Sequence, residues 1–325
     1  MSAGSATCSP EAAATTHLIV VQAQGRKHDP MAFYAPRPAG GGGGGGGGSS
    51  SSSSSSPRPD SPAAAATVAT TIPSALWKLT VPVHITHASL PSSAPFVASV
   101  PRFGYLALLL PRLAAYFGRP CSSFHHEDVQ LRNLPVGLLV DLYRPQALPW
   151  RLVADEGEGW HIGDTFLNGA KEADFLRNGH AKQIMSMSKD DTTALWNAVQ
   201  DGDYATFARI NNQLLNAPTP LKHVPIRIYI PSSSPSSPAT TTPAAAGSFR
   251  VMQALVAPRI ANKTPQTLGT ALRSLLPTLF PSSRDPVLAN VILHGAPVPF
   301  SAPLEALMRE AAYPDGWLCL TVVLL

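Results

Sequence analysis

The sequence predicts an α+β protein in which two small domains of strands and helices flank a helix-rich domain. The order strand, strand, helix, strand, short helix, strand occurs twice along the chain, and residues 161–218 between the two copies carry helical patterns. The composition of residues 1–71 predicts a disordered extension ahead of the first domain. With 325 residues, the chain is long enough for two or three domains of this kind.

The N-terminal extension, residues 1–71, is dominated by two runs of a single residue type. Gly40–Gly48 is unbroken glycine and Ser49–Ser56 is unbroken serine, and neither run can bury apolar surface to offset the entropy lost on ordering. The glycine run lacks the interleaved residues of a phosphate-binding loop, so it is predicted to be a flexible tether. A second low-complexity tract, residues 231–248, is predicted to be a disordered loop inside the last domain.

The first domain is predicted over residues 72–160. The alternation at residues 81–86 (VPVHIT) is typical of a half-buried strand, and residues 96–100 predict a second strand. Apolar residues then form one helical stripe over residues 106–117, where Pro111 predicts a kink. The remaining patterns predict a strand at 129–131, a short helix around 138–142 and a strand at 150–154.

The helix-rich domain is predicted over residues 161–218. Ser188 to Asp191 resembles a capping box, which would open a helix over residues 192–200 that ends at Gly202. Asp203 can cap the next helix, and the short connection favours antiparallel packing of the two helices.

The last domain is predicted over residues 219–325. Residues 223–230 alternate strictly, which places Val224, Ile226, Ile228 and Ile230 on one face of a strand, and residues 249–256 supply its hairpin partner. A helix at 268–276, a strand at 287–293, a short helix at 303–309 and a strand at 317–325 follow. This order, occurring twice, is that of the β-grasp, ubiquitin-like fold.

Composition excludes several classes of protein. The net charge is +4, which is too small for binding of nucleic acid by the field of the protein alone, although the pI is near 9.1. No secretory signal and no apolar run of about 20 residues is present. The three cysteines, Cys8, Cys121 and Cys319, are too scattered for a disulfide framework or a zinc site. We therefore expect a soluble, intracellular protein.

The densest group of possible metal ligands is His125-His126-Glu127-Asp128, which we interpret as a polar turn before a strand. The motifs of serine hydrolases, zinc proteases and phosphate loops do not occur. Cys319 lies in an apolar strand, where burial would raise the pKa of its thiol and make it inert. We expect no catalytic site, no metal and no cofactor.

Lys171 is a candidate for a different kind of chemistry. If residues 165–178 form one helix, Phe166, Ala170 and Ala173 share a face, and Lys171 lies about 140° from Phe166 at about 100° per residue. Its amine then points to solvent or to a groove between domains. Spacing alone favours a lysine that is merely solubilising, and Asn168-Gly169 disfavours a continuous helix.

Several longer motifs carry a resemblance to a known family. Lys171-Glu172-Ala173-Asp174 is followed by Lys182-Gln183-Ile184-Met185 and by Leu195-Trp196-Asn197-Ala198-Val199. Leu148-Pro149-Trp150, the segment from Pro135 to Leu142, Pro225 to Tyr229 and the ending from His294 to Leu318 belong to the same set. From about Trp77 to the C-terminus the chain resembles the autophagy protein 5 (APG5) family.

The resemblance implies two ubiquitin-like domains flanking a helix-rich domain, and it implies a function. Members of the family accept the C-terminal glycine of autophagy protein 12 in an isopeptide bond on the lysine that opens the K-E-A-D motif, here Lys171. The conjugate binds autophagy protein 16. It then acts like an E3 ligase with a lipid-conjugating E2-type enzyme, promoting transfer of autophagy protein 8 to phosphatidylethanolamine in autophagosome formation. The resemblance also implies a cytoplasmic protein held peripherally at the preautophagosomal (phagophore assembly) membrane.

The chain departs from the family at the first strand, where Leu79 stands in place of the glycine of a W-x-G-x-[IV]-P pattern. Two alternatives to the conjugation scaffold remain open. One is a tandem β-grasp module that binds its partners without a covalent bond. The other is a hydrolase or metal enzyme built on His125, His126 and Cys121.

Overall fold

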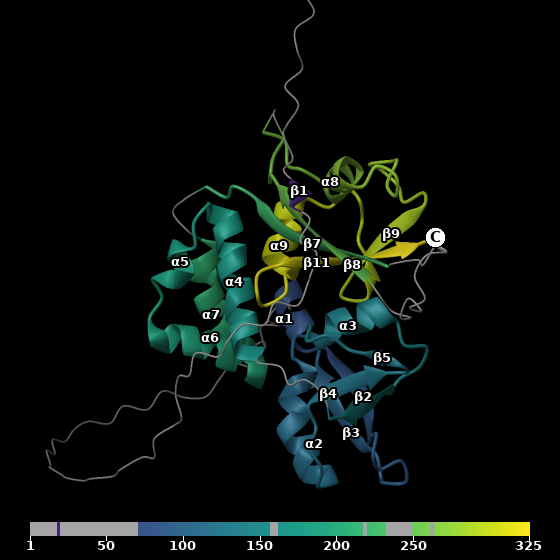
Figure 1. Ribbon diagram of the computed structural model, residues 1–325. Coiled ribbons are helices and arrows are strands. Elements are labelled where there is room, and N and C mark those ends of the chain that lie inside the picture. Colours follow the sequence, from purple (N-terminus) through teal and green to yellow (C-terminus); the bar gives the residue numbers. More distant parts are fainter. Residues whose placement is uncertain (1–17, 20–70, 157–161, 217–219, 232–248, 261–262) are drawn as a thin grey trace, which may run out of the picture. The chain divides into compact units, whose positions relative to one another are not determined.

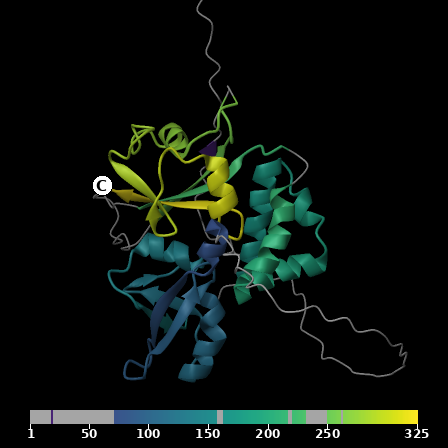
Figure 2. The ribbon, with the colours of Figure 1, turned by 180° about the vertical axis from the view of Figure 1, so that it is seen from behind.

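The computed structural model describes residues 18–19, 71–156, 162–216, 220–231, 249–260 and 263–325. Two β-sheets and a group of helices make up this part of the chain, and Figures 1 and 2 show them from opposite sides. The predicted disordered loop at 231–248 lies outside the described residues, apart from Pro231. The predicted architecture, with two ubiquitin-like domains around a helix-rich domain, is confirmed.

The first sheet has the strand order β3-β2-β6-β4-β5. Its central strands β2 and β6 are parallel, which requires the long crossover that the helices between them supply, and all other neighbours are antiparallel. The elements of this domain are α1 (Ile72–Trp77), β2 (Thr80–His87), β3 (Phe96–Pro101), η1 (Leu106–Leu109), α2 (Leu110–Phe117), β4 (Ser123–His126), β5 (Val129–Gln130), α3 (Val136–Tyr143) and β6 (Trp150–Asp155).

Pro111 marks a break in the first long helix, as predicted. The chain is a 3-10 helix in η1 and becomes α-helical at Leu110, so that Pro111 lies in the first turn of α2. A proline is tolerated there because its missing N–H would have no partner within the helix.

The prediction of a polar turn at His125–Asp128 is wrong in its first half. His125 and His126 belong to β4, and only Glu127 and Asp128 form the turn that leads into β5. The apolar anchor of β4 is Phe124, which is buried in the core of the domain. Because β4 contributes one apolar residue and two histidines, its sequence carries no alternation that predicts a strand.

The helix-rich domain contains α4 (Ile162–Asn178), α5 (Lys182–Met185), α6 (Lys189–Asp201) and α7 (Tyr204–Leu215). Ser188 caps α6 by accepting the Asp191 N–H, Gly202 ends α6 with φ 70°, and Asp203 caps α7 by accepting the Thr206 N–H. These caps confirm the predicted boundaries, although α6 begins three residues earlier than predicted. The positive φ of Gly202 explains why a glycine ends this helix.

The second sheet has the strand order β1-β8-β7-β11-β9-β10, with β7 and β11 parallel at its centre. Its central strand β7 was predicted to bury one face, but Pro225 and Tyr229 on the other face are buried as well. The elements are β7 (Val224–Pro231), β8 (Phe249–Val256), α8 (Leu268–Leu275), β9 (Ala289–Leu293), β10 (Ala296–Pro297), α9 (Leu304–Ala311) and β11 (Leu318–Leu324).

The first strand of that sheet, β1, comes from the N-terminal extension. Leu18–Ile19 pair antiparallel with β8, with Leu18 opposite Ala254 and Ile19 opposite Gln253. The prediction that residues 1–71 carry no element is therefore wrong at these two residues; the rest of the extension up to residue 70 lies outside the described residues. The physical reason is local, because Leu18-Ile19-Val20-Val21 is an apolar, largely β-branched run, and such runs favour strands.

Three clusters of buried residues underlie the three groups of elements. The first sheet and the helices α4 to α7 each have a cluster that consists mainly of their own residues. The cluster of the second sheet also includes Phe103 and Leu138 of the first domain and Ala173 of α4. The second ubiquitin-like domain is thus the one whose core the other two domains share.

Candidate functional site

Lys171 lies near the middle of α4, which is continuous through Asn168 and Gly169. Phe166, Ala170 and Ala173 are buried, whereas Lys171 is exposed, as the helical angle predicted. Among the described residues, no carboxylate forms an ion pair with the Lys171 ammonium. The amine is therefore free to be reached from solvent.

Gly169, one turn before Ala173, allows α4 to approach the second ubiquitin-like domain closely. The indole N–H of Trp317 donates a hydrogen bond to the Gly169 carbonyl oxygen at 3.0 Å. A Cβ at Gly169 would lie 3.1 Å from Asp315 Oδ2, which is tighter than ordinary van der Waals contact. Because a larger residue would push the helix away from this contact, we interpret Gly169 as a packing requirement and not as a helix break.

Gly316 provides the matching surface on the other side of this contact. It lies in the turn Tyr313–Trp317 (the 313–317 turn) with φ 83°, a left-handed conformation that glycine adopts without strain. A Cβ on Gly316 would lie 3.1 Å from the Cβ of Ala173. The two glycines together bring the backbone of α4 against the 313–317 turn.

Arg227 of β7 links the residue next to Lys171 to the same turn. Its guanidinium contacts Glu172 Oε2 at 2.8 Å and Asp315 Oδ2 at 3.6 Å, and it lies 3.9 Å from the centroid of the Trp317 ring. Burial disfavours the charged form of Arg227, but the surrounding anionic groups, Asp315 first, outweigh it and raise the pKa of Arg227. Burial also raises the pKa of Asp315, which Arg227 offsets only in part.

Asp174, the last residue of the K-E-A-D motif, has a structural role. Its carboxylate accepts hydrogen bonds from Asn178 Nδ2 at 2.7 Å and from the Ile184 N–H at 3.1 Å. These bonds fix the start of α5 against α4, and a buried carboxylate with two such donors is well satisfied. The motif therefore combines an exposed lysine, a partner for Arg227, a buried contact residue and a buried anchor.

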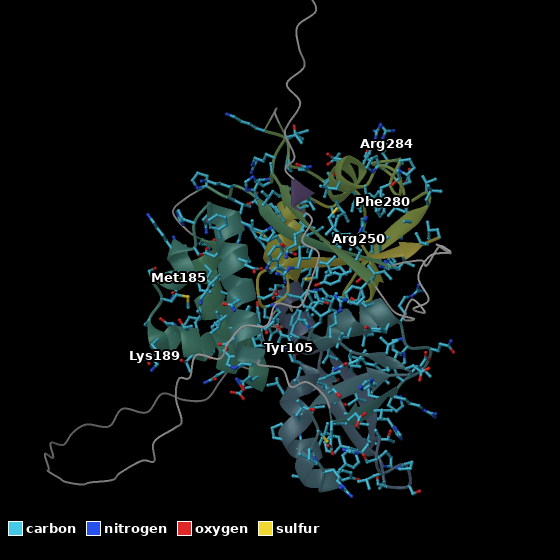
Figure 3. All side chains as sticks on the ribbon, viewed as in Figure 1. Tyr105, Met185, Lys189, Arg250, Phe280 and Arg284 are labelled. Carbon is cyan, nitrogen blue, oxygen red and sulfur yellow. The ribbon has the colours of Figure 1, made fainter. Side chains whose placement is uncertain are left out.

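Exposed apolar side chains accompany Lys171 on the outer surface of the helix-rich domain. Phe175, one turn along α4 from Lys171, is 55% exposed, and Met185 of α5 is 65% exposed. Figure 3 shows Met185 and Lys189 on the outer side of this group of helices. Lys171 thus has an exposed apolar side chain, that of Phe175, one turn away on the same helix.

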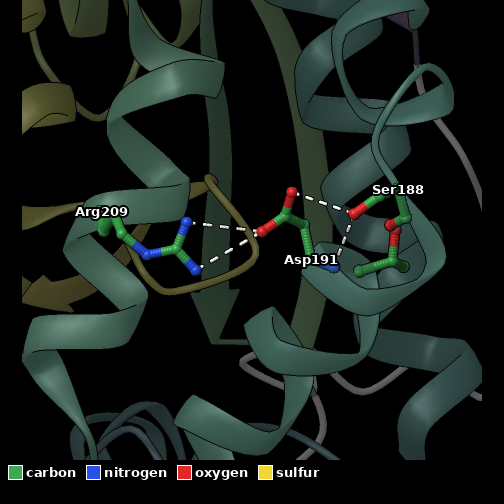
Figure 4. Close-up of polar contacts among 4 residues, drawn as sticks. Ser188, Asp191 and Arg209 are labelled. Atoms are coloured by element: carbon green, nitrogen blue, oxygen red, sulfur yellow. Dashed lines mark hydrogen bonds and ion pairs between the residues drawn. The ribbon is translucent and has the colours of Figure 1, made fainter. Parts of the chain in front are cut away.

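The start of α6 is tied to α7 on the same domain. The Asp191 carboxylate accepts from the Ser188 hydroxyl at 3.0 Å, and both Nη atoms of Arg209 lie 3.4 Å from Asp191 Oδ1 (Figure 4). An early residue of α6 meets the middle of α7, where the two helices pack side by side.

A second feature is a groove where α1, α7 and α9 meet, with a cavity of about 100 Å³. Its floor is aromatic, since the Trp77 ring lies 4.6 Å from Phe207 and 5.5 Å from Phe103. Ala208 and Asn211 of α7 and Arg309 of α9 line it further. We call it the α1–α7–α9 groove. A larger cleft, of about 780 Å³, lies between the first sheet and residues 144–149, and no described residue of α4 lines it.

The sequence matches the family models of autophagy protein ATG5 in three parts. These are the UblA domain over residues 76–155, the alpha-helical bundle region over 161–217 and the UblB domain over 223–322. Autophagy protein 5 of Chaetomium globosum is 70% identical over 260 residues, which cover 80% of this chain and 92% of that protein. The chain belongs to the autophagy protein 5 family.

Other members of the autophagy protein 5 family agree with this. The protein of Pyricularia oryzae is 69% identical over 256 residues, covering 78% of this chain and 80% of its own length. The crystal structure of Kluyveromyces marxianus Atg5 shares the fold, with a TM-score of 0.58 at 20% identity, over 78% of this chain and 99% of that chain. Membership gives this protein a role in autophagy, and its ubiquitin-like domains fit a non-catalytic scaffold.

The other candidates from the sequence are not brought together. In this member of the autophagy protein 5 family, His126 accepts the Trp150 indole N–H at 3.1 Å, and His125 is paired opposite Gln130. Burial raises the pKa of both Cys121 and Cys319, and Cys8 lies outside the described residues. Within the described part of the chain, no group of three metal-ligating residues occurs and no helix is long and apolar enough to cross a membrane.

The sequence did not predict the residues that hold α4 against the second ubiquitin-like domain, nor the residues that line the α1–α7–α9 groove. Arg227 and Trp317 are far from Lys171 in the chain, and their contact depends on the packing of two domains. One signal was available, because Gly169 interrupts a segment that other features would make a regular helix. A glycine inside a helix often marks a close backbone approach, and here it does.

Proposed function

We propose that this protein is the acceptor of autophagy protein 12 through an isopeptide bond on Lys171. The conjugate binds autophagy protein 16 and acts like an E3 ligase that promotes lipidation of autophagy protein 8 with phosphatidylethanolamine in autophagosome formation. The observation that carries this proposal is the exposed Lys171 on a helix whose backbone is held by Trp317, Gly169 and Gly316. An acceptor must present its amine in a fixed place, and α4 has buried contacts on the opposite side.

The proposed reaction needs only the Lys171 amine from this chain. The Lys171 amine attacks the thioester carbonyl that joins the C-terminal glycine of autophagy protein 12 to an E2-type enzyme, and the thiolate of that enzyme leaves. An amine has to be neutral to attack, although a free lysine has a pKa near 10.4, so a base on the conjugating enzyme removes the proton. Exposure and placement are what the acceptor supplies.

A reconstituted conjugation reaction tests the assignment. Lys171→Arg keeps the charge, but the guanidinium stays protonated and is not a nucleophile, so we expect loss of the adduct. Lys182→Arg, at an exposed lysine of α5 in the same domain, is the matched control and should conjugate like the unaltered protein. Adduct of normal yield with Lys171→Arg, or a branched tryptic peptide at another lysine, would refute the assignment.

The competing function is a tandem ubiquitin-like module that binds partners without conjugation. The low share of charged residues, 14%, and the exposed apolar side chains near Lys171 favour it. The two functions differ in one property, because only the conjugate gives a mass increase that survives denaturation. Mass spectrometry of the protein purified from cells under denaturing conditions separates them.

We assign the binding of autophagy protein 16 to the α1–α7–α9 groove. An amphipathic helix can bury its apolar face there, since the floor consists of Trp77, Phe103 and Phe207 and the rim carries Asn211 and Arg309. Ala208→Trp would fill the groove, and we expect it to weaken binding at least about tenfold, the equivalent of about 1.4 kcal/mol. Ala205→Trp, on an exposed position of α7 outside the groove, is the control; equal affinity of both variants would reject the groove.

The same proposed function implies where in the cell the protein works and with which enzyme. The conjugate works with the lipid-conjugating E2-type enzyme of the autophagy protein 8 system, from the cytoplasm, in peripheral contact with the preautophagosomal membrane. Peripheral attachment requires that the protein leave this membrane at high salt or alkaline pH without detergent, and fractionation of cell extracts measures that.

A further inference from the structure

The outer edge of β8 is a place where another strand can be added. β8 pairs with β7 along its whole length, from Phe249 opposite Pro231 to Val256 opposite Val224, so the groups on its other side have no partner from β7. Its sequence, FRVMQALV, contains no proline that would block pairing. The opposite edge of the same sheet is protected, because β10 is two residues long and ends in Pro297.

The structure places one segment on this edge. Leu18 pairs opposite Ala254 and Ile19 opposite Gln253 in antiparallel register, and Figure 1 shows β1 beside the strands of the second sheet. The family matches begin at residue 76, so this strand lies outside the matched domains. The segment is also distinctive in sequence, since Leu18-Ile19-Val20-Val21 is an apolar run in an extension otherwise rich in glycine, serine, alanine and proline.

We propose that the β8 edge is a strand-addition site for extended, β-branched apolar peptides, and that β1 (Leu18–Ile19) occupies it in cis as a removable cover. Main-chain hydrogen bonds supply the affinity in such additions, and alternate side chains supply the specificity. An open edge invites pairing with other chains, and a strand from the same chain closes it. The occupant is this chain's own segment.

The energetics make the cover displaceable. About 50 residues, including the glycine and serine runs, tether Ile19 to α1. Such a tether gives an effective concentration of order 1 mM. If the segment binds the free edge with a Kd of about 0.1 mM, it covers the edge about nine-tenths of the time. A competing peptide then sees its affinity lowered by about tenfold.

The first test uses the full chain. Ile19→Pro removes a backbone donor and cannot extend a ladder, so amides of β8 should exchange with solvent about tenfold faster in hydrogen-exchange mass spectrometry. Val68→Pro, in the same extension but outside the apolar run, is the matched control and should leave β8 unchanged. Unchanged exchange of β8 in Ile19→Pro would overturn the proposal.

The second test adds a synthetic peptide of residues 15–24 in trans. It should restore the protection of β8 in the Ile19→Pro chain, with about a tenfold lower apparent Kd than it shows for the unaltered chain. Protection that appears on another element, or equal affinity for both chains, would overturn the proposal. Light scattering completes the test, because a dimer that dissociates in Ile19→Pro would mean that a second copy fills the edge and not the cis segment.

Discussion

The two ubiquitin-like domains share an order of elements but differ in what covers their sheets. In the first sheet, β2 alternates between buried residues and half-buried or exposed ones, and β6 does the same. In the second sheet, β7 and β11 are buried on both faces over most of their length. One face of the first sheet is therefore partly exposed, whereas both faces of the central strands of the second sheet are covered.

The difference shows where the protein is held together. α4 packs against β7 and α3 packs against β11, so the face that is open in the first domain is occupied in the second. Asp141 of α3 accepts the backbone N–H groups of His294 and Gly295 and forms a buried ion pair with Arg102. The second domain is the part against which both others are positioned, and the position of Lys171 depends on it.

Two buried tryptophans give the largest expected effect in this comparison. Trp150 of the first sheet and Trp317 of the second are both fully buried, and each donates its indole N–H, to His126 and to Gly169 respectively. Replacing either with alanine should lower the free energy of unfolding by about 3–5 kcal/mol. Only Trp317→Ala should also speed hydrogen exchange in α4, because only Trp317 bridges two domains.

Denaturant unfolding measures the first quantity, and hydrogen-exchange mass spectrometry measures the second. Trp317→Phe is a useful companion variant, because it keeps most of the packing and removes the hydrogen bond to Gly169. Equal exchange of α4 in Trp150→Ala and Trp317→Ala would show that α4 does not depend on the second domain.

The contrast between the two sheets also shows what the sequence could predict. Periodicity predicted the longer strands of both domains, because each has at least one face on a local core, as Val83 and Ile85 do in β2, but it did not predict β4. It could not predict that the second face of β7 is covered, since α4 packs against β7, and Asp315 and Trp317 of the 313–317 turn contact Arg227. Contacts between domains leave no period in the sequence of either partner.

A pH-dependent contribution to stability is expected at the junction with the second domain. His294 is half-buried, with its ring against Phe103 and Tyr313, and its Nε2–H donates to the Ala311 carbonyl at 2.8 Å. Burial lowers the pKa of His294 from 6.5 to about 4. The unfolded chain therefore binds this proton first as pH falls, so His294 lowers stability between about pH 6.5 and pH 4.

The expected size of this loss in unfolding free energy follows from the shift in the pKa of His294. Between pH 7 and pH 4.5, His294 should account for about 2–3 kcal/mol of the loss in unfolding free energy. Buried Asp141 and Asp315 have raised pKa values, which act in the opposite direction. The measurement is therefore a difference between the unaltered protein and His294→Gln, which should lose less stability on acidification. A parallel decline of both with pH would contradict the prediction.

In the candidate site, too, some features could be predicted from neighbouring residues, whereas others depend on contacts between residues far apart in the sequence. The exposure of Lys171 could be predicted from its angle on the helix, and the caps at Ser188 and Asp203 from their residue types. The contact with Arg227 could not, because it joins residues 55 positions apart whose charges have many possible partners. Whether a surface lysine has a function is not encoded in helical spacing, which explains why only longer motifs singled out Lys171.

The smallest expected effect concerns the ion pairs at the surface of α4 and of the helices beside it. Glu172 is 56% exposed where it meets Arg227, and Arg209 is 58% exposed where it meets Asp191. Exposed pairs of this kind contribute about 0–1 kcal/mol, because water screens them and both side chains lose rotamer freedom. Glu172→Gln and Arg209→Gln should each lower the free energy of unfolding by less than about 1 kcal/mol, which denaturant titration can measure. Arg227 would keep Asp315 and the Trp317 ring as neighbours in the first variant. If Glu172→Gln instead cost as much as Trp317→Ala, the charge beside Lys171 would hold α4 on the second domain, and buried packing would not.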